Sequence, residues 1–200
     1  MRKKLGAVCM TIGVVLILGA IALLIWNNVE ANRAEQLSMK VVSQLKDTIT
    51  DNENQKTDAF DQEDTKTQKT QMSEVKIDGY DYLGYLSIPS QGLELPVMSQ
   101  WDYQRLQVSP CRYSGTIEQK NLVLIAHHYS SHFGNLDQLQ TQDEVLFTDV
   151  TGIVTNYQVV CTDVVPPTST KEVTAGDSDL ALVTCTYSGK TRLVVYCDEV

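Results

Sequence analysis

The sequence predicts an all-β domain, a small barrel or sandwich, in the part of the chain that follows residue 77. Short apolar runs alternate with turn residues throughout this part, and prolines punctuate them. Helical periodicity is confined to two short stretches. Many short strands with few helices are typical of β-sandwiches and β-barrels, and a closed barrel also leaves no exposed sheet edge.

The expected strands follow one another through this domain. In chain order they are Tyr82–Ile88, Leu93–Val97, Asn121–Ala126, Glu144–Thr148, Ile153–Thr162, Asp179–Thr184 and Thr191–Cys197. Single helical turns are expected at Gln100–Gln107 and Phe133–Leu139. The pattern therefore assigns residues 78–200 to one β-rich domain.

The N-terminal part of the chain predicts a membrane anchor. Leu5–Trp26 carries no charge and, at about 1.5 Å per residue in a helix, is long enough to cross a bilayer core of about 30 Å. Arg2, Lys3 and Lys4 precede it and have no equal behind it, so residues 1–4 are expected in the cytoplasm and the domain outside the cell. A cleaved signal peptide is the alternative, but no small-x-small cleavage site follows Trp26.

Residues 27–77 are expected to form a juxtamembrane helix and a flexible polar linker. Within Val29–Ile49, an apolar stripe at helical spacing predicts the helix, and its members are Leu37, Val41, Val42 and Leu45. Thr50–Glu74 is almost wholly polar and cannot bury enough apolar area to offset its ordering entropy. It is interpreted as a tether that holds the domain away from the membrane.

Composition limits the partners and the redox chemistry. The chain has a net charge of −9 at pH 7, and nucleic acid and anionic membrane surfaces need clustered Lys and Arg, so neither is expected to bind the domain. Of five cysteines, Cys9 lies in the apolar span and the others lie where disulfides are chemically permitted. There is no CxxC zinc pattern, and the spacing leaves open whether Cys111, Cys161 and Cys197 pair or fill the core.

A thiol and a guanidinium are predicted at the same edge of the sheet. Cys185 ends an apolar strand, and Arg192 begins the next strand after a short turn. A neighbouring permanent cation favours the thiolate, which is the nucleophilic form of cysteine. The alternative is an inert buried cysteine and a solvated arginine. If Cys185 is functional, it must stay free of disulfides.

The three histidines, His127, His128 and His132, lie within six residues of one another. His127 falls where an apolar strand ends and a polar loop begins, and this placement fixes the backbone while it exposes the side chain, as a general acid or base requires. His128 and His132 would share a face if the loop were helical, which would suit a metal ion. No HExxH pattern supports the metal interpretation.

Together these fragments resemble the sortases, the membrane-anchored cysteine transpeptidases of Gram-positive cell surfaces. The TLxTC motif of that family corresponds to Ala181–Cys185, with Ala181 in place of the leading Thr. Arg192 matches the arginine that opens the family's final strand. The resemblance covers roughly Tyr80–Tyr196, and the N-terminal anchor and tether also agree with the family's architecture.

The family's histidine ends an N-x-V-I-x-G-H strand, which corresponds to Asn121–His127. Ala126 stands where the family usually has Gly. Choosing His127 over His128 depends on aligning Asn121 with the family's Asn. The two alanines, Ala126 and Ala181, flank the site and bear on the details of substrate fit.

The resemblance implies a closed sortase-type barrel of about eight strands with one or two short helices, of a B-like or related small class. The chain ends directly after the last expected strand, which disfavours the pilin-polymerising class. The implied catalytic residues are His127, Cys185 and Arg192, and the implied substrate contacts are Thr184, Ala126, His128 and Leu182. No metal and no cofactor is implied.

The implied activity is cleavage of an LPxTG-like C-terminal sorting signal at its Thr. The acyl group would pass to an amine of the cell-wall peptide or of another surface protein, such as a pilin. Two alternatives stay open at this stage: a hydrolytic cysteine peptidase with the same three residues, and a non-catalytic membrane-anchored binding module with structural cysteines.

Overall fold

The computed structural model describes residues 13–23, 36–50, 72–169, 173 and 178–200. The chain divides into two compact units, residues 1–33 and 34–200. The cytoplasmic tip expected at residues 1–4 lies outside the described residues, and so does most of the tether expected at Thr50–Glu74. The fold of the second unit is therefore described from residue 36 onward, and helix 13–23 is taken by itself.

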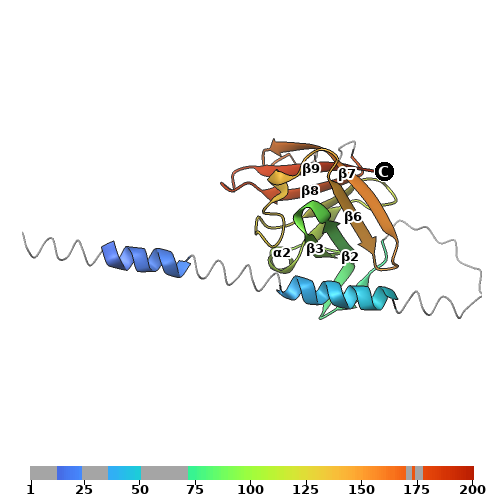
Figure 1. Cartoon of the computed structure of the whole chain (residues 1–200), viewed down its shortest axis with the longest axis horizontal. Coiled ribbons are helices and arrows are strands. Elements are labelled where there is room, and N and C mark those ends of the chain that lie inside the picture. The colour runs from blue at the N-terminus through green and yellow to red at the C-terminus, as the bar shows by residue number, and fades with distance from the viewer. Residues whose placement is uncertain (1–12, 24–35, 51–71, 170–172, 174–177) are drawn as a thin grey trace, which may run out of the picture. The chain divides into compact units, whose positions relative to one another are not determined.

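Eight strands of the second unit close into a barrel, to which β1 adds a ninth (Figure 1). The order in the sheet is β1-β2-β3-β4-β5-β8-β9-β7-β6, and pairing of β6 with β2 closes it. The strands are β1 (Val75–Ile77), β2 (Tyr80–Ile88), β3 (Leu93–Met98), β4 (Cys111–Ser114), β5 (Leu122–Ile125), β6 (Glu144–Asp149), β7 (Val154–Val165), β8 (Leu180–Cys185) and β9 (Arg192–Glu199). The expectation of an all-β closed barrel of about eight strands is confirmed.

The helices of the barrel's connections are short. They are α2 (Tyr103–Val108) and the 3-10 turns η1 (Pro89–Gln91) and η2 (Leu136–Gln138). Asp102 begins α2, because its carboxylate accepts hydrogen bonds from the backbone amides of Gln104 and Arg105. Both predicted helical turns are therefore present, and their ends differ from the expected bounds by one to three residues.

All seven expected strands are present, but β1 and β4 were not expected. Each is short and has a basic residue within it, Lys76 in β1 and Arg112 in β4, so neither shows an apolar run. Pairing with neighbouring strands forms them instead: β1 pairs with β2, and β4 pairs with β3 and β5. The domain consequently begins before residue 78, the boundary that the sequence predicted.

Helix 36–50 packs on the barrel, which the sequence left undecided. Val41 and Leu45 are buried in one cluster with Ile77 and Tyr82 of the sheet. At the rim of this contact, exposed Lys46 donates to Glu94 at 2.8 Å. Apolar burial is the main contribution, since such exposed ion pairs contribute little. The helix therefore belongs to the globular unit and not to the linker zone of residues 27–77; of the predicted stripe, only Leu37 is exposed.

Side chains of the sheet alternate between the barrel interior and an outer face. The interior of the barrel, which is the main core, takes alternate residues of the strands β5, β8 and β9: Leu122, Leu124, Leu180, Leu182, Leu193 and Val195. The residues between them form a smaller apolar cluster on the outer face: Val123, Ile125, Ala181, Val183, Val194 and Tyr196. This outer cluster carries the candidate site described below.

Gly84→Ala is expected to lower the free energy of unfolding by about 2–4 kcal/mol. Gly84 has φ +149, and a Cβ there would lie 1.9 Å from the backbone oxygen of Thr148, across the β2–β6 pairing that closes the barrel. Gly92→Ala is the matched control: its φ is +60, nothing lies within 4 Å of a Cβ, and only about 1 kcal/mol of left-handed strain is expected. Chemical denaturation measures both; equal losses would contradict the role of the close contact.

Helix 13–23 lies within the predicted anchor 5–26, and the rest of that span falls outside the described residues. Nearly all of its side chains are exposed and apolar, among them Leu16, Ile17 and Leu18. In the part of the chain that the structure describes, no helix is both long and apolar enough to cross a membrane. The membrane anchor therefore stays a prediction.

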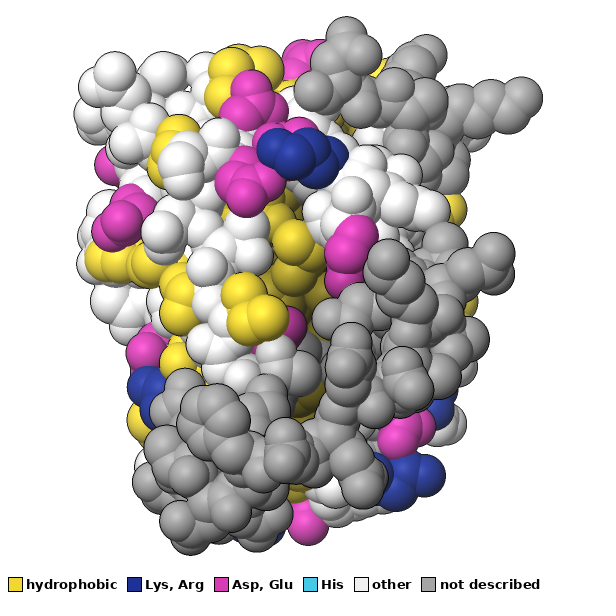
Figure 2. Space-filling view, turned by 90° about the vertical axis from the view of Figure 1, so that its right-hand side faces the viewer, with side chains coloured by type: hydrophobic (Ala, Val, Ile, Leu, Met, Phe, Trp, Pro, Cys, Tyr) yellow, Lys and Arg dark blue, Asp and Glu magenta, His cyan; other side chains and the backbone are white. Residues whose placement is uncertain are grey.

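Figure 2 shows the side of the molecule on which the C-terminus lies. Acidic side chains are spread over this face, and the basic side chains in view are fewer. Carboxylates also engage a lysine: Lys120 lies 2.8 Å from Glu199 and 3.5 Å from the partly buried Asp179. The acidic character expected from the net charge is thus visible on this face.

Candidate active site

The strand register places His127, Cys185 and Arg192 in one row across three neighbouring strands. β5 and β8 are parallel, and the amide of Ala126 donates to the carbonyl oxygen of Val183 at 3.1 Å, which continues their pairing beyond the end of β5. Extending this register by two residues sets His127 beside Cys185. On the other side, Cys185 lies opposite Arg192 in the antiparallel β8–β9 pair. The row thus runs from an imidazole through a thiol to a guanidinium.

A cavity of about 290 Å³ opens beside this row. Apolar side chains of the outer face form much of it, including Val123, Ile125 and Val183. The connection that follows β7 contributes Pro166 and Pro167. His127, Cys185 and Arg192 all line the same cavity, so the structure brings the three predicted catalytic side chains together.

Thr184 and Ala126 hold the two strand ends together. The Thr184 hydroxyl is buried and donates to the carbonyl oxygen of Ala126 at 3.0 Å. Both residues border the cavity, in agreement with the predicted placement. Because this hydroxyl already has an acceptor, the contribution of Thr184 is to fix the distance between the strand that carries Cys185 and the strand that precedes His127.

His127 begins a tight loop that stacks an aromatic ring against its imidazole. The Tyr129 ring lies 5.0 Å from the His127 ring, and the His127 carbonyl accepts from the amide of Phe133. A Cβ on Gly134 would lie 2.5 Å from the Tyr129 carbonyl oxygen, so the loop requires glycine there. Burial lowers the pKa of His127 below its ordinary value. The imidazolium therefore needs a nearby anion, and a thiolate at Cys185 would supply one.

His132 is expected to make the folded protein less stable as the pH is lowered. Burial, reinforced by the charge of His127 and opposed by the Val108 carbonyl, lowers the pKa of His132 to about 4 from an ordinary value of 6.5. Between these values the unfolded chain binds more protons than the folded one, so stability is lost as pH falls through this window, by at most about 3 kcal/mol. Thermal unfolding at pH 7.5 and pH 5 should show a smaller drop for His132→Phe; identical drops would contradict the assignment.

The structure places two other predicted substrate contacts away from the cavity. Leu182 has no exposed surface and belongs to the main core, on the face opposite Val183, so it serves packing and not substrate contact. The His128 ring lies 6.5 Å from the Tyr187 ring in an edge-on arrangement and does not border the cavity. His127, not His128, is the histidine that lines the cavity together with Cys185, as the Asn121 register predicts.

The metal interpretation of the histidine cluster gains no support. Among the residues that the structure describes, no group of three or more His, Cys, Asp or Glu side chains could hold an ion. The four cysteines in this part of the chain are free: Cys111, Cys161, Cys185 and Cys197. Burial raises the pKa values of Cys111 and Cys197 to about 12, so these two are packed thiols. Cys161 is exposed, and Cys185 alone lines the cavity.

An aromatic wall of the cavity was missed from the sequence. Trp101 lies 6.1 Å from Tyr103 and 5.6 Å from Tyr113, measured between ring centroids, and all three line the cavity. The signal was present in the Trp-Asp-Tyr run at the start of α2, where two aromatic residues flank a helix cap. They were not singled out because the third ring comes from β4, which was not predicted.

A thiol, an imidazole and a guanidinium around one cavity on a closed β-barrel point to the class of thiol-dependent acyl-transfer enzymes. The family comparison makes this specific, because the model described as Sortase domain matches residues 86–200, more than half of the chain. The chain belongs to the sortase family, whose members are cysteine transpeptidases. No curated protein matches it significantly.

Solved structures with the same fold are also sortases. Sortase C1 from Streptococcus agalactiae is 27% identical, with a TM-score of 0.55 over 62% of this chain and 70% of that one. Group B Streptococcus Pilus Island 1 Sortase C2 is 25% identical, with a TM-score of 0.52 over 58% and 73%. Sortase A from Corynebacterium diphtheriae is 24% identical, with a TM-score of 0.52 over 60% and 61%, which shows a common fold. Because the similar structures include both A and C sortases, the comparison assigns no class to this chain, and the B-like class stays a prediction.

Proposed function

We propose that this chain is a membrane-anchored sortase that cleaves an LPxTG-like C-terminal sorting signal at its threonine and transfers the acyl group to an amine. The observation that carries the proposal is the row of His127, Cys185 and Arg192 along the lining of one cavity. No other thiol among the described residues borders that cavity. The substrate would therefore lie in it with its scissile carbonyl at Cys185.

In the proposed reaction the Cys185 thiolate attacks the carbonyl carbon of the threonyl peptide bond. A carbon–sulfur bond forms, the carbon–nitrogen bond breaks, and the His127 imidazolium gives its proton to the leaving amine. Arg192 stabilises the negative charge on the carbonyl oxygen or holds the substrate backbone. An incoming amine then attacks the thioester, His127 takes up its proton, and Cys185 leaves as thiolate.

The walls of the cavity suit the residues that precede the scissile bond. Trp101, Tyr103 and Tyr113 line the cavity together with the apolar side chains of the outer cluster, and Arg192 supplies a permanent positive charge. Among the described residues of the lining there is no carboxylate. Such a surface favours uncharged, apolar peptide side chains, since burying a charge without a partner is costly.

The location of the enzyme is part of this proposal. The predicted anchor at residues 5–26 would hold the catalytic unit outside the cell membrane, where sorting signals of secreted surface proteins emerge. The amine would come from a cell-wall peptide or from a surface protein such as a pilin; the similarity to a pilus island sortase supports testing the latter. The proposed chemistry uses a thiol, an imidazole and a guanidinium and requires no cofactor.

A panel of fluorescent pentapeptides, incubated with the chain in the presence and absence of an oligoglycine amine, tests the proposal. Mass spectrometry of the products is expected to show a peptide–amine conjugate whose amount rises with amine concentration. A free acid as the sole product at every amine concentration would instead identify a hydrolytic peptidase. No cleavage, together with no faster alkylation of Cys185 than of exposed Cys161, would contradict both and favour a binding module.

A further inference from the structure

The turn between β8 and β9, residues 186–191, holds the guanidinium of Arg192. Its Nη1 donates to the carbonyl oxygens of Gly189 at 3.2 Å and of Thr191 at 3.1 Å. Because the guanidinium is a planar fork with fixed donor directions, two acceptors on one nitrogen fix the orientation of the whole group. The N–H groups of Nε and Nη2 are then left for the cavity that Arg192 lines.

Thr186 holds this turn in place from inside. Its amide donates to the Thr191 carbonyl oxygen at 3.1 Å, and its hydroxyl lies 3.4 Å from the same oxygen. The same hydroxyl is hydrogen-bonded to the Thr191 hydroxyl at 2.9 Å. At the other end of the turn, the Gly189 amide donates to the Thr186 carbonyl oxygen at 2.8 Å. Thr186 therefore fixes both segments whose carbonyls bind Arg192.

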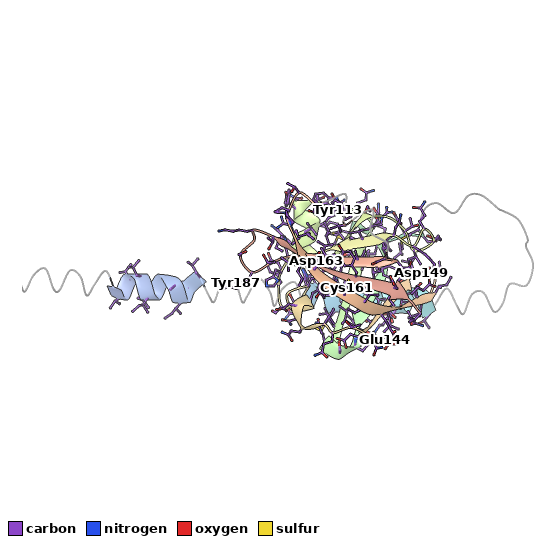
Figure 3. All side chains as sticks on the ribbon, turned by 90° about the horizontal axis from the view of Figure 1, so that it is seen from above. Tyr113, Glu144, Asp149, Cys161, Asp163 and Tyr187 are labelled. Atoms are coloured by element: carbon purple, nitrogen blue, oxygen red, sulfur yellow. The ribbon has the colours of Figure 1, made fainter. Side chains whose placement is uncertain are left out.

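Apart from the edge-on contact between the Tyr187 and His128 rings, the turn has few other contacts to hold it. Tyr187, the next residue, is 96% exposed, and Figure 3 shows it at the end of the barrel from which the turn projects. Ser188 makes its hydrogen bonds within the turn, to the Thr186 hydroxyl at 3.2 Å and to the Lys190 amide at 3.4 Å. With so little packing, the hydroxyl network is what distinguishes one conformation of the turn from others.

We propose that Thr186 is a positioning residue, whose hydroxyl orients the Arg192 guanidinium toward the cavity through its hydrogen bonds to Thr191. The inference rests on the proposed function, because it requires Arg192 to act on the substrate. Thr186 does not border the cavity and is half-buried beside it. Its effect on catalysis is consequently indirect and should vanish when Arg192 is removed.

Thr186→Val and Thr186→Ser separate the hydroxyl from the shape of the side chain. In the full chain, Thr186→Val is expected to lower kcat/KM for the sorting peptide about three- to tenfold, the factor that corresponds to one ordinary hydrogen bond. Thr186→Ser is expected to restore the wild-type value. Thr141→Val is the matched control, because the hydroxyl of Thr141 also bonds a backbone carbonyl, that of Val160 in β7, and Thr141 does not border the cavity.

A double-mutant cycle with Arg192→Ala decides between positioning and general stability. Thr186→Val is expected to have no further effect on the residual activity of Arg192→Ala, with thermal unfolding recorded for every variant. An equal loss in both backgrounds, or wild-type activity in Thr186→Val, would overturn the inference alone. A wild-type chain that transfers no peptide overturns the proposed function as well, so the two failures are distinguishable.

Discussion

Cys185→Ala is expected to abolish cleavage and transfer of a sorting-signal peptide, with a loss of at least about 10³-fold. The thiol is the proposed nucleophile, and Cys185 is the only cysteine among the described residues of the cavity. The fold should be unaffected, because the side chain is only half-buried at the end of β8 and alanine loses a single sulfur. Product formation by mass spectrometry and thermal unfolding measure the two effects separately.

Cys161→Ala is the control variant, because it removes a thiol that lies outside the cavity. Cys161 is exposed on β7 and does not line the cavity, so this variant should retain wild-type activity (Figure 3). Buried Cys111 and Cys197 are poor controls, since their removal opens space in the core. Full activity in Cys185→Ala would contradict the assignment of the nucleophile.

The hairpin that carries Cys185 and Arg192 was predictable because its signals are local. An apolar strand, a polar turn with Gly189 and a second apolar strand are adjacent in sequence, and antiparallel pairing follows from the turn. The position of His127 was predictable in the same way, from the end of an apolar run. These local patterns were sufficient for an all-β barrel or sandwich and for the three candidate side chains.

The contacts that complete the site were not predictable, because they join distant segments. β5 and β8 pair in parallel, and the hydrogen bond from Thr184 to Ala126 spans 58 residues. No turn signal specifies a parallel pair. The family resemblance consequently gave Leu182 as a substrate contact, although Leu182 lies in the main core and its neighbour Val183 lines the cavity.

Whether helix 36–50 packs on the domain could not be predicted from its sequence. Its stripe is short enough to be marginal as an isolated helix, and sequence alone does not say what covers it. In the structure, β1 and β2 supply part of the partner surface, and Val41 and Leu45 become buried. Because β1 was itself too short to predict, the surface it helps to form was also missed.

Arg192→Lys is expected to lower kcat/KM by about 10²-fold, although it keeps the positive charge. Removal of one preorganised oxyanion donor typically has an effect of this size. One Arg192 nitrogen satisfies the carbonyls of Gly189 and Thr191, while the others remain available to the cavity. A lysine has one nitrogen, so it either binds these carbonyls or turns to the substrate. The measurement is steady-state transfer of the sorting peptide to an amine.

Arg112→Lys is the matched control, because it removes a guanidinium held in the same manner but away from the cavity. Arg112 donates from Nε to the Ser99 carbonyl oxygen at 3.0 Å and from Nη1 to that of Gly115 at 3.2 Å, and it does not border the cavity. This variant should lower the melting temperature and leave kcat/KM of the folded enzyme unchanged. Near-normal kcat/KM in Arg192→Lys would show that Arg192, like Arg112, only ties a turn, and the oxyanion would then depend on backbone amides near Cys185.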